Sequence, residues 1–549
     1  MILALSKVLS APSAKSSATS LTLSTAFSAM SFALSKASSA ISPNPSVASF
    51  TLSIVSSATS LALSTNTSAF SAIVLPASLA LSVASPANLV ASFTALSVAS
   101  LALPKIFLKK LPSPIILFIF RFANLMNIPL TIKTLLVLVI LNVSPFLYAQ
   151  NRETAKEIIT QLCSDDFAGR GYLEQGDLKA ANYISGLFGK IGLSSLTDGY
   201  KHQFLLNVNT FPKAIVSIDG KELNPGYDFL VAPNSASAVG ERDIFYVSPR
   251  MLTSSKVAKK VKKALKKGFI PVISIFDSKD KILSENFQEI KKCNKGATLV
   301  VLKESLTWSV SMEQAKEAEI WLVDSIFDRF SKQISFNIKS EFKQDYESQN
   351  ILGFVPGTEY PDSFIIFCGH YDHLGKMGDA IFYGANDNAS GIAMLVDMAT
   401  YFNENPQKYS VAFVAFGAEE AGLVGSYSYV KDPIIPLSKT KFLFNMDLMG
   451  SGEDGATIVN GTIYKEDFER LKKINSDHDY LSSIKARGKA ANSDHYFFSE
   501  AGVPSFFIYL RGKYTYYHSP ADNNDNLKLG EYYDRSFLLI RDFIISINE

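Results

Sequence analysis

The feature that most constrains the fold is a stretch in which three apolar runs each end in acidic or imidazole side chains. The runs and the polar residues that follow them are Phe364–Phe367 with His370 and Asp372, Val411–Phe416 with Glu419 and Glu420, and Phe442–Met446 with Asp447. Short apolar runs followed by glycine and charge are typical of buried strands in an α/β sheet. Because ligands bind at the carboxyl ends of such strands, we expect this edge of the sheet to be the active site.

Helical periodicity surrounds these strands. The sequence predicts a helix over 153–162 and a second over Asp177–Ile191, with Asp177 as its N-cap and Gly192 as its stop. A last amphipathic helix follows Leu529. Together with the strands, these helices favour an α/β catalytic domain built from residues 150–204 and 345–549.

Residues 205–344 differ in character and contain no cluster of acids and imidazoles. Asp219-Gly220 predicts a hairpin turn, Lys256–Lys267 a short basic helix, and three apolar runs predict strands. The lysine run could contact membrane or nucleic acid, but alanine, valine and leucine interrupt it, which favours a solvated helix face. We interpret 205–344 as an α/β insertion domain.

The first 125 residues have a different composition from the rest. Serine, alanine, leucine and threonine dominate, and the first acidic residue of the chain is Glu153. This is low-complexity sequence: either a disordered or exposed extension, or the product of a misassigned start site. Seven basic residues precede Met126 in a chain of net charge +2, so the remainder is mildly acidic and predicts no nucleic-acid partner.

Residues 126–149 have the three parts of a signal peptide. Lys133 supplies the positive charge, Leu135–Leu141 the apolar core, and Ala149 the small residue at the cleavage point. The apolar core is short for a transmembrane helix, although an uncleaved anchor is the alternative. The sequence thus predicts a secreted or periplasmic protein without stable membrane insertion after cleavage. Three cysteines, without metal-ligand spacing, argue against a disulfide framework.

The polar residues of the central stretch suit a metal. His370 and His518 could each offer an imidazole, and Asp387, Glu420 and Asp447 could offer oxygen, a set that suits zinc. Five protein ligands are too many for one catalytic zinc but match two zincs that share a bridging carboxylate. Glu419 could then act as a general base, and Asp372 could hold the other N–H of the His370 imidazole.

The motifs GHYDH, GANDNASG, GAEEAGLVGS, NMDLMG and YYHSPAD resemble those of the two-zinc aminopeptidases of peptidase family M28. The resemblance covers roughly 349–526, with a weaker match at 166–193. It implies a three-layer αβα sandwich around a mixed, mostly parallel sheet, with the insertion in the position of a protease-associated domain. It also implies peptide substrates and removal of N-terminal residues.

The resemblance further implies a role for each site residue. His370 and Asp447 would bind one zinc, Glu420 and His518 the other, and Asp387 would bridge them, with a cis peptide bond to Asn388. Glu419 would be the general base, and Tyr517 would hydrogen-bond the oxyanion of the tetrahedral intermediate. His373 and His495 match the surroundings of the family's site but not its ligands.

Two alternatives of other classes stay open. One is an acyltransferase of the glutaminyl-cyclase type, which uses a single zinc on the same fold. The other is a non-catalytic binding protein with a peptidase fold, for which loss of ligands would be expected. The complete set of five ligand positions argues against both.

Overall fold

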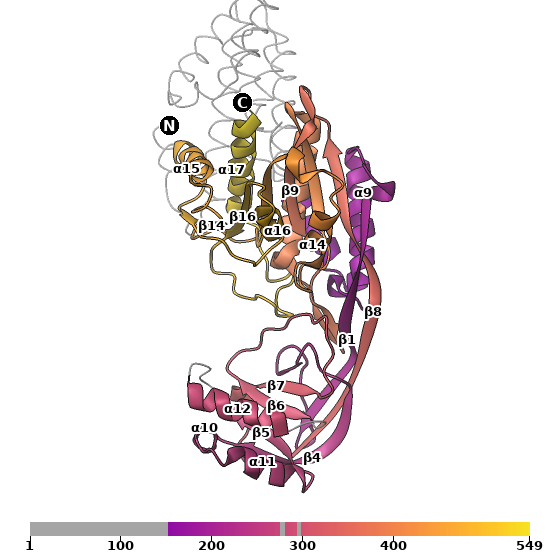
Figure 1. The fold of residues 1–549 in the computed structure, drawn as a ribbon, viewed down its shortest axis with the longest axis vertical. Coiled ribbons are helices and arrows are strands. Elements are labelled where there is room, and N and C mark those ends of the chain that lie inside the picture. The colour runs from indigo at the N-terminus through magenta and orange to yellow at the C-terminus, as the bar shows by residue number, and fades with distance from the viewer. Residues whose placement is uncertain (1–151, 275–279, 294–297, 549) are drawn as a thin grey trace, which may run out of the picture. The chain divides into compact units, whose positions relative to one another are not determined.

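The computed structural model describes residues 152–274, 280–293 and 298–548 (Figure 1). These residues lie in the second of two compact units of the chain, Ala149–Glu549. The expected low-complexity extension and signal peptide, residues 1–125 and 126–149, lie outside the described residues. No helix within the described ranges combines the length and the apolarity needed to cross a membrane.

One large sheet runs through the unit. Its path is β15-β14-β16-β13-β9-β12-β8-β4-β5-β6-β7-β3, with β1, β2, β10 and β11 attached beside it. The strands are β1 Lys201–Ile218, β2 Lys221–Glu222, β3 Phe229–Val231, β4 Ala238–Val247, β5 Ile270–Ser274, β6 Leu299–Lys303, β7 Glu319–Val323, β8 Gln333–Val355, β9 Tyr360–His370, β10 Gly375–Met377, β11 Ala380–Phe382, β12 Tyr409–Phe416, β13 Thr440–Asp447, β14 Ala456–Val459, β15 Ile484–Ala486 and β16 Ser505–Leu510.

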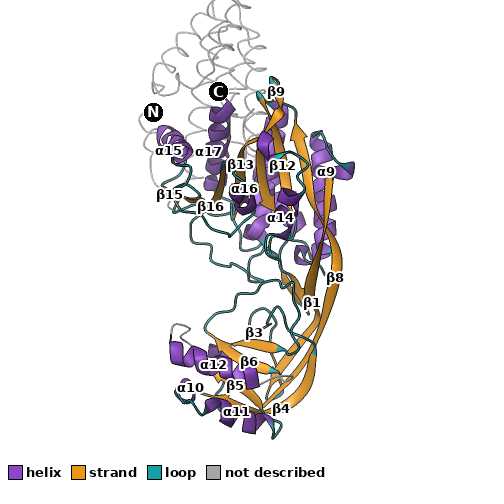
Figure 2. Cartoon of the chain, in the orientation of Figure 1, coloured by secondary structure: helices purple, strands orange, loops and turns teal. Residues whose placement is uncertain are grey.

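The helices lie mainly around this sheet (Figure 2). They are α8 Arg152–Leu162, α9 Gly176–Ile191, α10 Pro249–Leu252, α11 Val257–Leu265, α12 Lys281–Cys293, α13 Ser390–Glu404, α14 Val424–Lys431, α15 Lys465–His478, α16 His495–Glu500 and α17 Glu531–Asn548.

The part of the sheet from β14 to β8 is mixed and mostly parallel. β12, β9, β13 and β16 are mutually parallel neighbours, whereas β8 and β14 pair antiparallel to this block at its two sides. Their strands are buried on both faces because helices cover both sides. The parallel block also brings the carboxyl ends of β9, β12 and β13 to one edge.

Alternating side chains of these strands divide between two apolar layers. Phe367, Phe413 and Phe444 face a core that also holds residues of α8, α9, α13, α15 and α17. Ile366, Val414 and Leu443 face a second core with Tyr429 of α14 and Phe498 of α16. The period of two along each strand therefore produces the three-layer αβα arrangement that the resemblance implied.

Residues 205–344 form a smaller layered arrangement. β4, β5, β6 and β7 carry α10, α11 and α12 on one face, packed through Val261, Ile273 and Ile290. On the other face, Trp308 and Phe336 share a core with Met377 and Phe382. Because β10 and β11 belong to the main part of the chain, the insertion and the main part share this core.

The expected boundaries at 204/205 and 344/345 fall inside two long strands. β1 and β8 pair antiparallel from Lys201↔Ile351 at one end of the ladder to Ile218↔Ile334 at the other. The two strands run continuously from the main part into the insertion (Figure 1). Register shifts between Leu206 and Val208 and between Thr210 and Lys213 interrupt the ladder there.

Local predictions for this region can be compared with the structure. Asp219 and Gly220 form the turn between β1 and β2, with φ of 48° and 80°. Gly192 ends α9 at φ 88°, as predicted, but Asp177 is not the N-cap. Its carboxylate is buried and accepts hydrogen bonds from Tyr346 and Ser348 instead.

Candidate active site

The predicted polar residues gather where the parallel strands end. His370 and Asp447 are the last residues of β9 and β13, and Glu419 and Glu420 follow β12. Asp387 lies in the 385–389 segment before α13, and His518 lies in the loop between β16 and α17. Segments that are distant in sequence thus contribute to one site, which is buried apart from its rim.

Asp387 lies between the two imidazoles. His370 Nε2 is 3.3 Å from Asp387 Oδ1 and 3.4 Å from Asp447 Oδ2. His518 Nε2 is 3.3 Å from Asp387 Oδ2 and 3.3 Å from Glu420 Oε2. Each oxygen of Asp387 therefore faces a different histidine, and each histidine faces a second carboxylate.

These separations fit metal ligands better than hydrogen bonds. Two ligands about 2.0–2.1 Å from one tetrahedral zinc lie about 3.3 Å apart, whereas charged hydrogen bonds are about 2.7–2.9 Å long. His370 Nε2 and Asp447 Oδ1 are buried, and neither has a hydrogen-bond partner among the residues that the structure describes. The two-imidazole, three-carboxylate donor set therefore fits metal ions at two neighbouring positions.

The electrostatics of the site favour a cation. Burial opposes the charged form of His518, but Glu420 and Asp387 outweigh it and raise its pKa to about 11. Burial likewise opposes a charged His370, yet Glu419, Asp447 and Asp387 raise its pKa well above its ordinary value. The carboxylates thus draw positive charge to both imidazoles.

His373 is a third imidazole at the site. His373, Asp387 and Glu420 form one of three residue groups in the described chain with ligand atoms close enough for a metal. However, His373 Nδ1 lies 2.7 Å from Glu420 Oε1, which is a hydrogen-bond distance. We therefore assign His518 as the ligand candidate and His373 as a hydrogen-bond partner of Glu420.

Asp372 contacts the site differently from the sequence expectation. Its carboxylate Oδ1 is 3.8 Å from His370 Nδ1, whereas its main-chain oxygen is 3.1 Å from that nitrogen. The carboxylate accepts the main-chain N–H groups of Glu419 at 3.0 Å and Glu420 at 3.2 Å. Asp372 therefore anchors the turn that carries both glutamates, because the main-chain N–H groups of that turn lie nearer to its carboxylate than the imidazole does.

Glu419 and Tyr517 border the metal-ligand candidates. Burial, together with the charges of Glu420, Asp494 and Asp447, raises the pKa of Glu419 well above its ordinary value. Tyr517 is 54% exposed, and its ring stacks on His518 with centroids 3.8 Å apart. The side chain is only partly buried, but this burial and the negative charges of the site's carboxylates raise the pKa of Tyr517, so its hydroxyl is a donor at neutral pH.

Arg170 and Asp522 support the Asp387 segment and were missed by the sequence reasoning. The buried Arg170 guanidinium donates to the main-chain oxygens of Tyr371, Gly384 and Asp387. Asp522 accepts the N–H groups of Asn386 at 2.8 Å and Asp387 at 3.0 Å. Asp522 is the last residue of the YYHSPAD motif, and an acidic residue so close to His518 could have indicated its role from the sequence.

The Asp387–Asn388 peptide is cis, as the resemblance implied. Gly384, just before it, has a φ of 61°, and a Cβ there would collide with the Asp387 oxygen and the His373 ring. Glycine is therefore required at the start of the GANDNASG motif.

Two adjacent buried residues, Asp494 and His495, lie close behind the site. Both carboxylate oxygens of Asp494 are buried, and this burial raises its pKa to about 7. Sequence reasoning missed Asp494. His495 packs against the Phe507 ring, and burial lowers its pKa to about 3, so it is a neutral structural residue.

A cavity opens beside the site. Its volume is about 250 Å³, and it is lined by Asn386, Leu448, Ser451, Leu510, Arg511, Gly512, Tyr514, Tyr517 and Asp522. Asn386 and Tyr517 are next in sequence to Asp387 and His518, which places the cavity next to the metal-ligand candidates.

Comparison with known proteins supports the fold and relates one segment of the chain to a known family. The profile described as Peptidase family M28 matches residues 350–541, which contain all five ligand candidates. This segment is therefore similar to peptidase family M28. The solved structure of a zinc aminopeptidase from Bacillus subtilis covers 72% of this chain and 94% of its own, at 20% identity and a TM-score of 0.55.

Two curated proteins are similar to part of this chain. Aminopeptidase YwaD of Bacillus subtilis is 28% identical over 215 residues, which cover 36% of this chain and 45% of that protein. A vacuolar membrane protease of Candida glabrata is 27% identical over 183 residues, covering 32% of this chain and 18% of that protein. The aligned segments thus span less than half the length of these two relatives.

Proposed function

We propose that the chain is a zinc-dependent aminopeptidase that hydrolyses N-terminal residues from peptides. The observation that carries this proposal is the arrangement around Asp387, in which two imidazoles each face two carboxylate oxygens at 3.3–3.4 Å. The similarity of residues 350–541 to peptidase family M28 supports the same reaction class.

Two zinc ions fit the five ligand candidates. His370 and Asp447 would hold one ion, Glu420 and His518 the other, and Asp387 would bridge them. Zinc supplies a Lewis acid that polarises a carbonyl and lowers the pKa of water.

Glu419 is the proposed general base. A carboxylate oxygen of Glu419 lies within 4.8 Å of ligand atoms of His370 and Glu420, where it can take a proton from the attacking water and later give it to the leaving amine. The anchoring of its main-chain N–H by Asp372 holds the carboxylate in place between these two transfers. Tyr517 is the proposed donor to the oxyanion, because its ring stacks on His518 and its hydroxyl stays protonated.

The surroundings of the site favour the end of a peptide. Carboxylates at the site can pair with an α-ammonium group, which favours a free N-terminus. The adjoining cavity of about 250 Å³ can receive the first side chain, since tyrosine and leucine side chains line it.

We further propose that the protein is exported through residues 126–149 and acts as a secreted or periplasmic enzyme. The support is the charge, apolar core and small cleavage residue of that segment.

A glutaminyl-cyclase-type acyltransferase remains the alternative. That enzyme type would need one zinc. Here the nitrogen–oxygen distances around His518 are 3.3 Å, close to the 3.3 and 3.4 Å around His370, so both positions suit a metal equally. An assay of aminoacyl-nitroanilides and of an N-terminal glutaminyl peptide, with and without a chelator, distinguishes the two reactions and a non-catalytic protein.

The test of the mechanism compares two adjacent glutamates. Glu419→Gln should reduce kcat by about 10²–10⁴-fold with little change in KM, while both zinc ions stay bound. Glu420→Gln should weaken one zinc site, and added zinc should partly restore its activity. Kinetics and metal content are measured on both variants. Loss of a zinc in Glu419→Gln but not in Glu420→Gln would reverse the proposed roles.

A further inference from the structure

The 304–318 loop of the insertion reaches the candidate metal site. It connects β6 to β7, and its Trp308 main-chain oxygen lies 2.7 Å from His518 Nδ1. A main-chain oxygen can only accept a hydrogen bond, so His518 must carry its proton on Nδ1. In the neutral ring, Nε2 then has a free lone pair facing Asp387 and Glu420.

Trp308 is held firmly by its own side chain, which is 4% exposed. The indole Nε1–H donates to Val231 O at 2.8 Å, and the ring stacks on Phe382 with centroids 4.7 Å apart. Phe382 belongs to the main part of the chain, so the indole joins the insertion to it.

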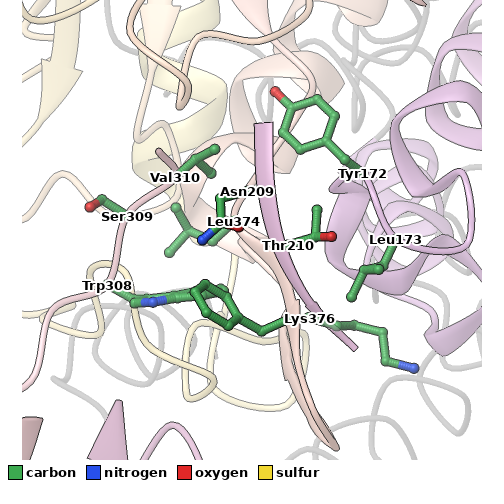
Figure 3. A pocket seen from close by; sticks show the side chains of 10 residues that line it. Tyr172, Leu173, Asn209, Thr210, Trp308, Ser309, Val310, Leu374 and Lys376 are labelled. Atoms are coloured by element: carbon green, nitrogen blue, oxygen red, sulfur yellow. The ribbon is translucent and has the colours of Figure 1, made fainter. Parts of the chain in front are cut away.

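Hydrogen bonds to β1 also hold the rest of the 304–318 loop. Asn209 N–H donates to Ser311 O at 2.9 Å, and Gln314 donates to Asn209 Oδ1 at 2.9 Å. Figure 3 shows Trp308, Ser309 and Val310 beside Asn209 and Thr210 of β1. The cavity between them has a volume of only about 10 Å³, room for about one water molecule, so the loop packs closely against β1.

We propose that Trp308 is a positioning residue for His518, through which the insertion completes one half of the metal site. The main-chain oxygen of Trp308 fixes the imidazole's tautomer and direction, and the buried indole fixes the oxygen. This inference rests on the proposed metal function. Partners that orient a ligating imidazole in this way commonly change metal affinity by about 10–100-fold when they are removed.

The chain offers a matched control. It contains two tryptophans, and the second, Trp321, lies in β7 of the same insertion. The Trp321 indole donates to Glu319 Oε1 at 2.7 Å, within its own strand. Removal of either indole perturbs the insertion, but only Trp308 is hydrogen-bonded to His518.

The experiment measures the zinc affinities of the full chain by chelator competition. Trp308→Ala keeps the main-chain oxygen but frees it to move, so it should weaken one of two zinc sites by at most about 10–100-fold and leave the other unchanged, whereas Trp321→Ala should leave both unchanged. In a His518→Asn background, Trp308→Ala should cause no further loss at the remaining site.

Three results would overturn the inference. These are unchanged affinities in folded Trp308→Ala, equal weakening by both alanine variants, or equal weakening of both sites by Trp308→Ala. If Trp308→Ala does not fold, Trp308→Phe decides, since it keeps an aromatic ring and loses the bond to Val231. It should weaken the same site severalfold, and unchanged affinity would reject the proposal. A wild-type protein that binds fewer than two zincs would instead refute the proposed function.

Discussion

Replacement of Asp372 by asparagine should lower the activity of the site, although Asp372 is not a proposed metal ligand. In the wild type, each carboxylate oxygen accepts one main-chain N–H, from Glu419 and from Glu420. Asparagine keeps one acceptor oxygen and points an NH₂ group at the other N–H. One charge-assisted hydrogen bond is therefore lost, and the asparagine NH₂ group faces a main-chain N–H group that is also a donor.

The size of the effect follows from these contacts. A hydrogen bond to a charged group contributes about 1.5–3 kcal/mol, and about 1.4 kcal/mol corresponds to a tenfold change. We therefore expect kcat/KM to fall by about 10–100-fold, as Glu419 and Glu420 lose their alignment. The range agrees with the usual loss on removing a group that orients a metal ligand.

The assay is the steady-state hydrolysis of an aminoacyl-nitroanilide, with zinc content measured on the same samples. Burial raises the pKa of Asp372 to about 8. The loss of kcat/KM in Asp372→Asn relative to the wild type should therefore be largest above that pH, where the wild-type carboxylate is ionised and accepts both N–H groups. Asp362→Asn, an exposed change in β9, is the control. An Asp372→Asn enzyme within twofold of the wild type above pH 8 would refute the reasoning.

Two further predictions concern other parts of the chain. The pKa of His495 is about 3 in the folded protein and 6.5 in the unfolded chain. As the pH falls below 6.5, only the unfolded chain binds a proton at this residue, so the folded protein loses stability. Between pH 7 and pH 5, the unfolding free energy of the wild type should therefore fall by about 2 kcal/mol more than that of His495→Phe. Denaturant titrations at both pH values measure this difference, and His478→Gln, which changes an exposed histidine, is the control. An equal pH dependence of the wild type and His495→Phe would contradict the prediction. A chain beginning at Met126 should be exported and cleaved after Ala149, as seen by N-terminal sequencing of the secreted protein, and failure of export without residues 1–125 would contradict the start-site interpretation.

The sequence alone determined the α/β class and pointed to side chains that the fold brings to one edge of the sheet. His370, Glu420 and Asp447 could be recognised because each follows an apolar run, and strand periodicity is a local property of the chain. Neighbouring strands that end in polar residues deliver them to one edge, whatever the details of packing. The match of residues 350–541 to the M28 family agrees with the resemblance that the sequence motifs carry.

Only the tertiary structure decided how the site is supported. The carboxylate of Asp372 holds the Glu419–Glu420 turn, and Arg170 holds the Asp387 segment, although neither partner is near in sequence. The contact from Trp308 to His518 joins residues 210 positions apart through a main-chain oxygen, which is the same in every amino acid. Such an acceptor has no signature in the sequence, because its position depends on how the loop packs rather than on which side chain it carries.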